Sequence, residues 1–297
     1  MNKTTLADHA LPFTGERFVP ERQDEIAIEH MHRYALAMEF CDNKDILDIA
    51  SGEGYGSDLL ATRAKSVIGV DIAKEAIEHS QSKYQRSNLR YLEGRADSIP
   101  LDACSVDVVV SFETLEHHNM HEEMYAEIKR VLRPGGLLII STPDKLFYSD
   151  LPKFENEYHV KELYLEEFRN LSAKYFKNVT MVFQKLAYGS LLVSEQNNTA
   201  FEYYAGTVGE IDSSAQLPEP TYNICMASDE TVPPVGVSLF DAAKILADYQ
   251  AQSSEKPRLD ARLESLSKQL NDVVNSRSYR LGRMLTWLPR KISGGNT

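Results

Sequence analysis

The segment SFETLEHHNMHEE, residues 111–123, gathers side chains suited to acid–base or metal chemistry. His117 and His121 lie four residues apart, which is a spacing that two metal-binding histidines use on one helix. Glu113 and Glu116 offer carboxylates that can exchange protons or contact a substrate. The segment alone therefore leaves three possibilities: a metal site, an acid–base site, or the rim of a site built elsewhere.

A second group of residues forms the loop LDIASGEGYGS at 47–57, between an apolar run and an amphipathic one. Its glycines allow a tight turn and a close approach of backbone to a ligand. They are Gly52, Gly54 and Gly56. This spacing differs from the G-x-G-x-x-G of dinucleotide-binding loops. Asp48 precedes the turn, and Asp71 in IGVDI occupies the position from which a carboxylate accepts both hydrogen bonds of a ribose diol.

Short apolar runs alternate with amphipathic segments from residue 45 to about residue 184. This alternation predicts an α/β fold with a Rossmann-like, doubly wound, mostly parallel sheet of seven strands. The expected strands include KDILDIA, SVIGVDI, LRYLEGRAD, SVDVVVSF and LLIISTP, followed by VTMVFQ and an antiparallel YNICMASD. The carboxyl ends of such strands would bring the glycine loop, the two acids and the segment after the fourth strand to one edge.

These residues resemble class I S-adenosylmethionine-dependent methyltransferases over roughly residues 13–184, with GRAD after the third strand and EIKRVLRPGGLLIISTP around the fifth. The resemblance implies S-adenosylmethionine as the cofactor and S-adenosylhomocysteine as the product. It places Ala50 and Gly52 at the methionine end and Asp71 at the ribose. The other implied cofactor contacts are Asp48, Gly54, Gly56, Ile72, Asp97 with Ser98 at the adenine, Phe112, and Arg33 at the cofactor's carboxylate.

The flanking segments FTGERFVPE, EHMHRY, FETLEHH and NEYHVKELYLEEF resemble methyltransferases encoded with bacterial surface-polysaccharide genes. This implies O-methylation of a sugar hydroxyl in a surface glycan such as O-antigen or lipopolysaccharide. Two alternatives stay open: a small acceptor such as a quinone precursor or nucleotide sugar, and a non-catalytic cofactor-binding scaffold. No Asn-Pro-Pro-Tyr-like motif follows the fourth strand, which disfavours methylation of amino groups on bases or glutamine.

A sugar hydroxyl is a poor nucleophile until it begins to lose its proton, so a general base is expected. His159 and His117 are both candidates, whereas His118 and His121 are expected to face solvent. Substrate contacts are expected from Arg17, His30, Tyr34, Glu113 and Glu116. The sequence identifies no third ligand for a zinc site and no oxygen-rich set for magnesium, so no metal is expected.

The chain divides into three regions: an N-terminal lid or substrate segment at 1–40, the methyltransferase domain at 41–251 with an insertion at about 185–219, and a C-terminal extension at 252–297. That extension begins with a linker. A leucine seam at 259–273 predicts a helix, possibly a coiled coil that joins copies of the chain. The basic, amphipathic tail predicts contact with a membrane surface or with glycan-assembly enzymes.

Charge and composition narrow the partners and the location. The formal net charge is -12, yet the last 24 residues carry five basic and no acidic side chains. A body this acidic repels nucleic acid, so a DNA or RNA substrate is disfavoured. Three scattered cysteines and the lack of a long apolar run favour a cytoplasmic protein, possibly peripheral at the inner face of the cytoplasmic membrane.

Overall fold

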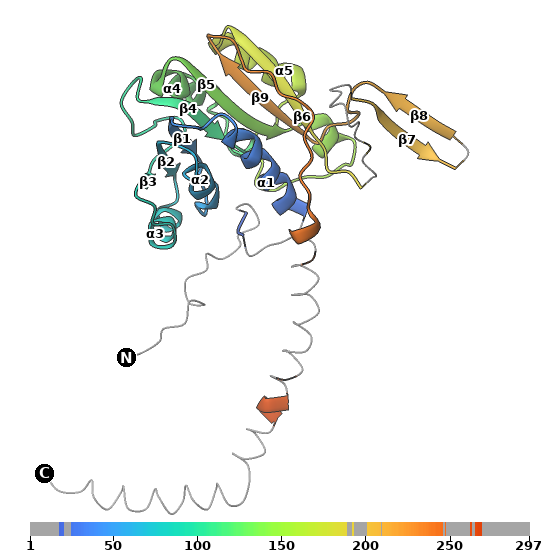
Figure 1. Cartoon of the computed structure of the whole chain (residues 1–297), viewed down its shortest axis with the longest axis horizontal. Helices are drawn as coiled ribbons and strands as arrows, with labels where there is room; N and C mark the ends of the chain where they lie inside the picture. The colour runs from blue at the N-terminus through green and yellow to red at the C-terminus, as the bar shows by residue number, and fades with distance from the viewer. Residues whose placement is uncertain are drawn as a thin grey trace, which may run out of the picture. The chain divides into compact units, whose positions relative to one another are not determined.

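The computed structural model describes residues 18–20, 25–188, 192, 201–208, 210–245, 247, 262 and 265–268 (Figure 1). The chain forms two units, residues 1–241 and residues 242–297. In the second unit, residues 243–245 and 265–268 are helical, and Leu266 is exposed. Arg17, most of the leucine seam and the basic tail lie outside the described residues, so the predictions made for them stay predictions.

Seven strands of the first unit form one sheet in the order β3-β2-β1-β4-β5-β9-β6. Their bounds are β1 Asp45–Ile49, β2 Ser66–Asp71, β3 Leu89–Glu93, β4 Val106–Ser111, β5 Leu132–Pro143, β6 Asn178–Gln184 and β9 Tyr222–Ser228. Strands β1 to β5 pair in parallel, and β9 runs antiparallel to both β5 and β6. The predicted mostly parallel, seven-stranded sheet is confirmed, although its last strand in sequence inserts between β5 and β6.

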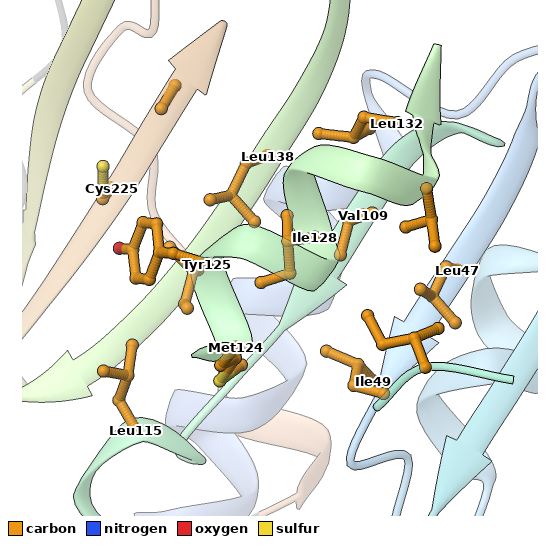
Figure 2. Packing of buried hydrophobic residues seen from close by; sticks show 14 of the residues in the cluster. Leu47, Ile49, Val109, Leu115, Met124, Tyr125, Ile128, Leu132, Leu138 and Cys225 are labelled. Carbon is orange, nitrogen blue, oxygen red and sulfur yellow. The ribbon is translucent and has the colours of Figure 1, made fainter. Parts of the chain in front are cut away.

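Helices cover both faces of this sheet, because successive side chains of each strand point to opposite faces. The helices are α1 Glu25–Met38, α2 Tyr55–Leu60, α3 Lys74–Lys83, α4 His121–Val131 and α5 Leu165–Tyr175. Leu47 and Ile49 of β1 belong to the same buried apolar cluster as Tyr125 and Ile128 of α4 (Figure 2). Ile46 of the same strand belongs to a second apolar cluster, which includes residues of α1 and α2. The two cores hold the carboxyl ends of the strands at one edge.

The predicted insertion contains a β-hairpin in place of the irregular segment that its sequence indicated. Strand β7, Tyr203–Thr207, pairs antiparallel with β8, Glu210–Ser214, as a sheet of its own. Large side chains such as Tyr204 and Ile211 are mostly exposed there. Short alternating strands with little apolar content give a weak sequence signal, which explains the difference.

The described helices are all too short or too polar to span a lipid bilayer.

Candidate active site

A pocket of about 420 Å³ opens beyond the carboxyl ends of β1, β2 and β4. It joins four regions that are separate in the sequence: the glycine loop, the end of β2, the segment after β4, and the segment 94–97 after β3. Ala50 and Gly52 line it from the first, Asp71 and Ile72 from the second, and Glu113, Thr114 and His117 from the third. In open parallel sheets, ligands bind in this position. The pocket is therefore the candidate active site.

The glycine loop bends sharply where it meets the pocket. Ala50 has φ 60° and Gly52 has φ 56°, both in the left-handed region. For an alanine this conformation costs about 1–2 kcal/mol, so the surrounding fold must hold it there. The side chain of Ser51 is buried, and its Oγ has no hydrogen-bond partner among the described residues. The loop therefore presents the backbone of Ala50 and Gly52 to the pocket, while Ser51 is buried and does not line it.

Two of the predicted cofactor glycines instead make room for protein side chains. A Cβ on Gly54 would lie 2.6 Å from Ser80 Oγ, and one on Gly56 would lie 2.0 Å from Tyr34 Cζ. Neither glycine lines the pocket. The prediction that both contact the cofactor is therefore corrected, because their missing side chains allow close packing behind the loop.

Asp71 ends β2 with its carboxylate turned to the glycine loop. Oδ2 accepts a hydrogen bond from Gly52 N at 2.8 Å, and Oδ1 accepts one from Ala73 N at 2.9 Å. Next to it, Ile72 leaves 62% of its surface exposed at the pocket. A carboxylate beside an exposed apolar side chain suits a ribose diol joined to a flat base. Together with the left-handed backbone of Ala50 and Gly52, these residues fit S-adenosylmethionine.

Asp97 also lines the pocket, but its carboxylate is already engaged. Both of its oxygens accept hydrogen bonds from Arg95, each at 2.8 Å, and these bonds lower the pKa of Asp97. Ser98 is exposed and does not line the pocket. Asp97 lines the pocket and Ser98 does not, and the contact of either residue with adenine stays a prediction.

Asp48 lies behind the loop and not in the pocket. Its carboxylate accepts a hydrogen bond from Ser57 Oγ at 2.6 Å and a longer one from the Tyr34 hydroxyl at 3.3 Å. Burial raises the pKa of Asp48 to about 7. Phe112 packs edge-on against the Tyr34 ring and likewise does not line the pocket. The predicted direct cofactor contacts of Asp48 and Phe112 are thus replaced by support of the loop from behind.

The predicted substrate residues of α1 also pack inside the protein. Tyr34 is 4% exposed. His30 stacks on Phe18 and shares a 2.7 Å hydrogen bond with the Tyr55 hydroxyl. Burial lowers the pKa of His30 well below its ordinary value, so the ring is neutral. Neither residue lines the pocket, which corrects the prediction that they contact the substrate there.

Arg33 occupies a buried network behind the pocket. It is 1% exposed, donates to Gln184 Oε1 at 2.8 Å and lies over the ring of Tyr222 at 4.8 Å. Its Nη1 is 3.8 Å from Glu113 Oε1. Arg33 does not line the pocket, and its pairing with the cofactor's carboxylate stays a prediction. The guanidinium instead joins α1 to β6 and β9, and it neutralises a carboxylate that does line the pocket.

Glu113 is held in an unusual conformation at the rim. Its φ is 52°, in the left-handed region that a glutamate rarely adopts. Ser141 Oγ donates to Glu113 Oε1 at 2.5 Å, and Glu113 N donates back to Ser141 Oγ at 3.2 Å. Such strain is found at sites where side-chain direction matters. The bonds with Ser141 fix the carboxylate of Glu113 at the pocket, and its contact with the acceptor stays a prediction.

His117 is the last residue of the short 3-10 turn Leu115–His117, and it lines the pocket. Its Nδ1 is 3.1 Å from the carbonyl oxygen of Tyr158, which can only accept. Nδ1 therefore carries the proton, and Nε2 has the lone pair. Nε2 is 3.9 Å from Oε1 of Glu116, which is 1% exposed and does not line the pocket. Burial raises the pKa of Glu116 well above its ordinary value.

His159 meets His117 although the two are far apart in sequence. Their rings cross at 82° with centroids 5.2 Å apart. Glu116 joins the two segments, because its carbonyl accepts hydrogen bonds from Val160 N and Lys161 N. The prediction that His159 reaches the site of His117 thus agrees with the geometry, and its chemical role stays a prediction.

Both nitrogens of His159 are engaged. Nδ1 is 2.5 Å from Glu162 Oε1, and Nε2 is 3.0 Å from Asn156 Nδ2, which can only donate. Sequence reasoning missed Asn156 and Glu162. They flank His159 at three residues on either side, and that spacing was the available signal.

The other two histidines of the opening segment do not form a metal site with His117. His121 is 4% exposed, and its Nε2 contacts the carbonyl oxygen of Leu115 at 2.8 Å. It lines a separate pocket of about 370 Å³ between α4 and α5. His118 lies against it, with ring centroids 5.5 Å apart, and is half-buried. The expectation that both face solvent was wrong, because the 3-10 turn folds them back onto the protein.

Residues 47–140 match the family model described as a methyltransferase domain. This stretch holds β1, the glycine loop, Asp71 and the rim. The match indicates a methyltransferase domain within this stretch of the chain. A protein of Pyrococcus horikoshii shares the fold of this methyltransferase domain, with a TM-score of 0.51, 17% identity, and coverage of 73% of this chain and 96% of that one.

Three curated mycobacterial proteins are similar to part of this chain. A probable S-adenosylmethionine-dependent methyltransferase of Mycolicibacterium smegmatis is 38% identical over 54% of this chain and 63% of its own length. A probable methyltransferase of Mycobacterium tuberculosis is 36% identical over 57% of this chain and 62% of its own. The phthiotriol/phenolphthiotriol dimycocerosates methyltransferase of Mycobacterium leprae is 33% identical over 40% and 45%. The chain thus spans less than two thirds of these relatives.

Proposed function

We propose that the protein transfers a methyl group from S-adenosylmethionine to a hydroxyl oxygen, and that the acceptor is a sugar of a bacterial surface glycan. One observation carries the reaction type: a single pocket joins the glycine loop and Asp71 to a rim with His117 and Glu113. The first part fits the methyl donor, and the second offers groups that can take a proton. The sequence resemblance to polysaccharide-gene methyltransferases supports the glycan acceptor.

The cofactor supplies a methyl group on a sulfonium, which is already an excellent leaving group. The residues of the chain therefore act mainly by positioning. Asp71 and the backbone around Gly52 hold the ribose and the methionine portion. Glu113, fixed by Ser141, orients the acceptor hydroxyl. Packing of Tyr34 behind Gly56 keeps the loop in place.

His117 fits the role of proton acceptor better than His159. His117 lines the pocket, and the carbonyl oxygen of Tyr158 accepts a hydrogen bond from its Nδ1, which fixes the direction of the ring. In His159, Nε2 already accepts from Asn156 and Nδ1 already bonds Glu162. His159 also does not line the pocket. We therefore propose that His117 takes the proton of the acceptor hydroxyl and that His159 supports His117 from behind the pocket.

A lipid alcohol is the second candidate acceptor. The relative from Mycobacterium leprae is named for methylation of dimycocerosates. In this chain, apolar side chains are exposed on the segment around His159: Leu151 by 61%, Phe154 by 50% and Val160 by 63%. An apolar acceptor would cover such side chains. The small-molecule acceptors and the scaffold without turnover also stay predictions.

The test is transfer of radioactive methyl from labelled S-adenosylmethionine to cell extracts from the source organism. The full chain is incubated separately with the polysaccharide fraction and the organic-solvent fraction. We expect label in polysaccharide that survives mild base, as a methyl ether does. Label in the organic fraction would favour the lipid alcohol. Tight cofactor binding with no transfer to either fraction, or to quinone precursors and nucleotide sugars, would contradict methyl transfer and favour the scaffold.

We also propose that the C-terminal extension decides where the protein lies in the cell. The basic tail would hold it at an anionic membrane surface or at glycan-assembly enzymes, and the seam at 259–273 would join copies of the chain. Flotation with anionic vesicles compares the full chain with a chain that ends at residue 251. Equal flotation of both would contradict membrane contact through the tail.

A further inference from the structure

Three side chains beside the pocket converge as metal ligands do. Glu116, His117 and His159 each offer one ligand atom, and these atoms all lie within 4.8 Å of one another. Glu116 is 1% exposed, and the side chain of His159 is 8% exposed. Two imidazoles and one carboxylate held together in a buried place are a donor set used for divalent ions.

We propose that Glu116, His117 and His159 bind one divalent first-row transition-metal ion at the acceptor end of the pocket. This site replaces the His117–His121 pair considered from sequence, and it contradicts the expectation that the protein has no metal. The proposal that an ion binds to these three residues does not depend on the proposed function. Its part in catalysis, described below, rests on that function.

The ligands are oriented by the groups that surround them. The Tyr158 carbonyl binds the protonated Nδ1 of His117 at 3.1 Å, so Nε2 is the atom with a lone pair for an ion. The Glu162 carboxylate holds Nδ1 of His159 at 2.5 Å in the same way. Metal-binding histidines usually donate their second N–H to a carbonyl or a carboxylate. Both arrangements are present here before any ion is considered.

The carboxylate ligand has a similar support. Thr142 Oγ1 donates to Glu116 Oε2 at 3.1 Å, while Oε1 lies 3.9 Å from His117 Nε2. The two atoms that would share an ion thus face each other at a distance too long for a hydrogen bond. Two metal bonds of about 2.0–2.2 Å span such a gap with little movement.

One existing contact must be exchanged. Asn156 Nδ2 now donates to the lone pair of His159 Nε2 at 3.0 Å, and one lone pair cannot serve both partners. The amide has a second partner, because Nδ2 also lies 3.3 Å from the Tyr148 hydroxyl. Binding of the ion would therefore turn the Asn156 amide fully toward Tyr148.

The charges of the region favour a cation. Glu113, Glu116 and Glu162 lie around the two histidines. Within the described part of the chain, Glu116 and Glu162 form ion pairs with histidines alone. Arg33 is 3.8 Å from Glu113 and partly offsets that one carboxylate. A divalent ion bound among these side chains would interact favourably with their carboxylates.

The donor set indicates which ions fit. Two nitrogens and one oxygen suit Zn²⁺, Mn²⁺, Fe²⁺ or Co²⁺, whereas Mg²⁺ and Ca²⁺ prefer oxygen ligands. Three protein ligands leave at least one open position. The acceptor hydroxyl would take it, and the ion would lower the pKa of that hydroxyl. The C–S bond to the methyl group breaks as the O–C bond forms, sulfur keeps the electron pair, and the hydroxyl proton passes to Glu113. His117 is then a ligand and no longer the base.

The test uses the full chain after removal of metal by a chelator and dialysis. Calorimetric titration with Mn²⁺ and with Zn²⁺ measures affinity and stoichiometry, in a Cys104→Ser background because Cys104 is exposed and could bind zinc by itself. We expect one ion per chain. The variant Glu162→Gln, which removes the carboxylate that holds His159 Nδ1 and also accepts from Ser149 Oγ, should bind the ion on the order of 10–100-fold more weakly.

Substitutions of the ligand residue His159 test the ion site more directly than Glu162→Gln does. His159→Ala and the conservative His159→Asn should both lose at least as much affinity as Glu162→Gln. His118→Ala is the matched control, since His118 lies beside His117 in the same pocket but outside the cluster. It should bind the ion as the parent does. Circular dichroism checks that each variant is folded, and two substitutions at His159 guard against one that fails to fold.

Two results would overturn the inference. One is absence of binding by the stripped parent chain, and the other is equal affinity in the parent and in folded His159 variants. Affinity for S-adenosylhomocysteine, measured on the same samples, reports on the proposed function separately. If the cofactor binds and methyl transfer proceeds at full rate with chelator present, the ion site is wrong while methyl transfer with His117 as the base stands.

Discussion

Replacing Asp71 with alanine should weaken binding of S-adenosylhomocysteine by about 100-fold. The carboxylate is placed to accept two hydrogen bonds from the ribose diol, and bonds to a charged group contribute about 1.5–3 kcal/mol each. Water and rearrangement recover part of this sum, so about 3 kcal/mol is a reasonable net loss. Since about 1.4 kcal/mol corresponds to a factor of ten, the expected change in Kd is about 100-fold.

Asp71 also holds the pocket itself, through Gly52 N at 2.8 Å and Ala73 N at 2.9 Å. The alanine variant should therefore lose stability as well, by about 1–3 kcal/mol for each N–H left without a partner in a buried place. Asp71→Asn separates the two effects, because its remaining carbonyl oxygen can still accept one bond. It should weaken ligand binding by roughly tenfold, between parent and alanine.

Isothermal titration calorimetry measures Kd, and urea unfolding measures stability. Asp58→Ala is the matched control: it removes an aspartate of α2 that pairs with Arg86 on the surface and does not line the pocket. Its Kd should stay within about twofold of the parent value, as expected for a surface ion pair. If folded Asp71→Ala binds S-adenosylhomocysteine within threefold of the parent, then Asp71 does not hold the ribose and the reading of the pocket is refuted.

Three further predictions concern the support of the pocket. Gly56→Ala should lower the free energy of unfolding by about 1–3 kcal/mol in urea titrations, because the new Cβ would meet the Tyr34 ring; parent-like stability would contradict this. Asp48, whose pKa is raised to about 7, keeps its proton in the folded state after the unfolded chain has lost it near pH 4. The free energy of unfolding should therefore fall as the pH rises from about 4 to about 7. Asp48→Asn should reduce that fall, as measured by urea unfolding at about pH 4 and at about pH 7. An unchanged fall in the variant would show that Asp48 is not its cause. Arg33→Met should cost about 3–5 kcal/mol, because Glu113 loses the cation beside it, and a loss below 1 kcal/mol by thermal unfolding would show that the pair is unimportant.

The parallel half of the fold could be predicted because each strand carries its own signal. An apolar run of about five residues such as DILDI or SVIGVD, followed by a turn and an amphipathic stretch, indicates a buried parallel strand wherever it occurs. The insertion of β9 between β5 and β6 could not be predicted, because strand order depends on pairing between segments distant in sequence. The hairpin of β7 and β8 gave too weak an alternation to be seen.

The cofactor side of the site was partly predictable for a similar reason. Asp71 sits at the end of an apolar strand, and that position alone directs its carboxylate to the pocket. Gly56 shows the limit: a glycine that admits a ligand and one that admits a tyrosine ring look the same in sequence. Ala50 and Glu113 have a left-handed backbone, but neither residue type predicts that conformation from sequence.

The acceptor side was less predictable, since it depends on a contact across the chain. The sequence singled out His117 and His159 separately, but only the folded chain shows their rings 5.2 Å apart with Glu116 between the two segments. Arg33 was expected at the cofactor because it is a cation on α1. Its burial against Tyr222 and Gln184 reflects the position of β9 and β6, which the sequence did not reveal.

A crystal structure of the full chain with S-adenosylhomocysteine tests the central claim most directly. The account predicts the ribose hydroxyls on the Asp71 carboxylate, the methionine portion along Ala50 and Gly52, and the sulfur turned to the rim formed by Glu113 and His117. Density for the ligand in another place would contradict it. So would a ligand in this pocket whose sulfur faces away from that rim.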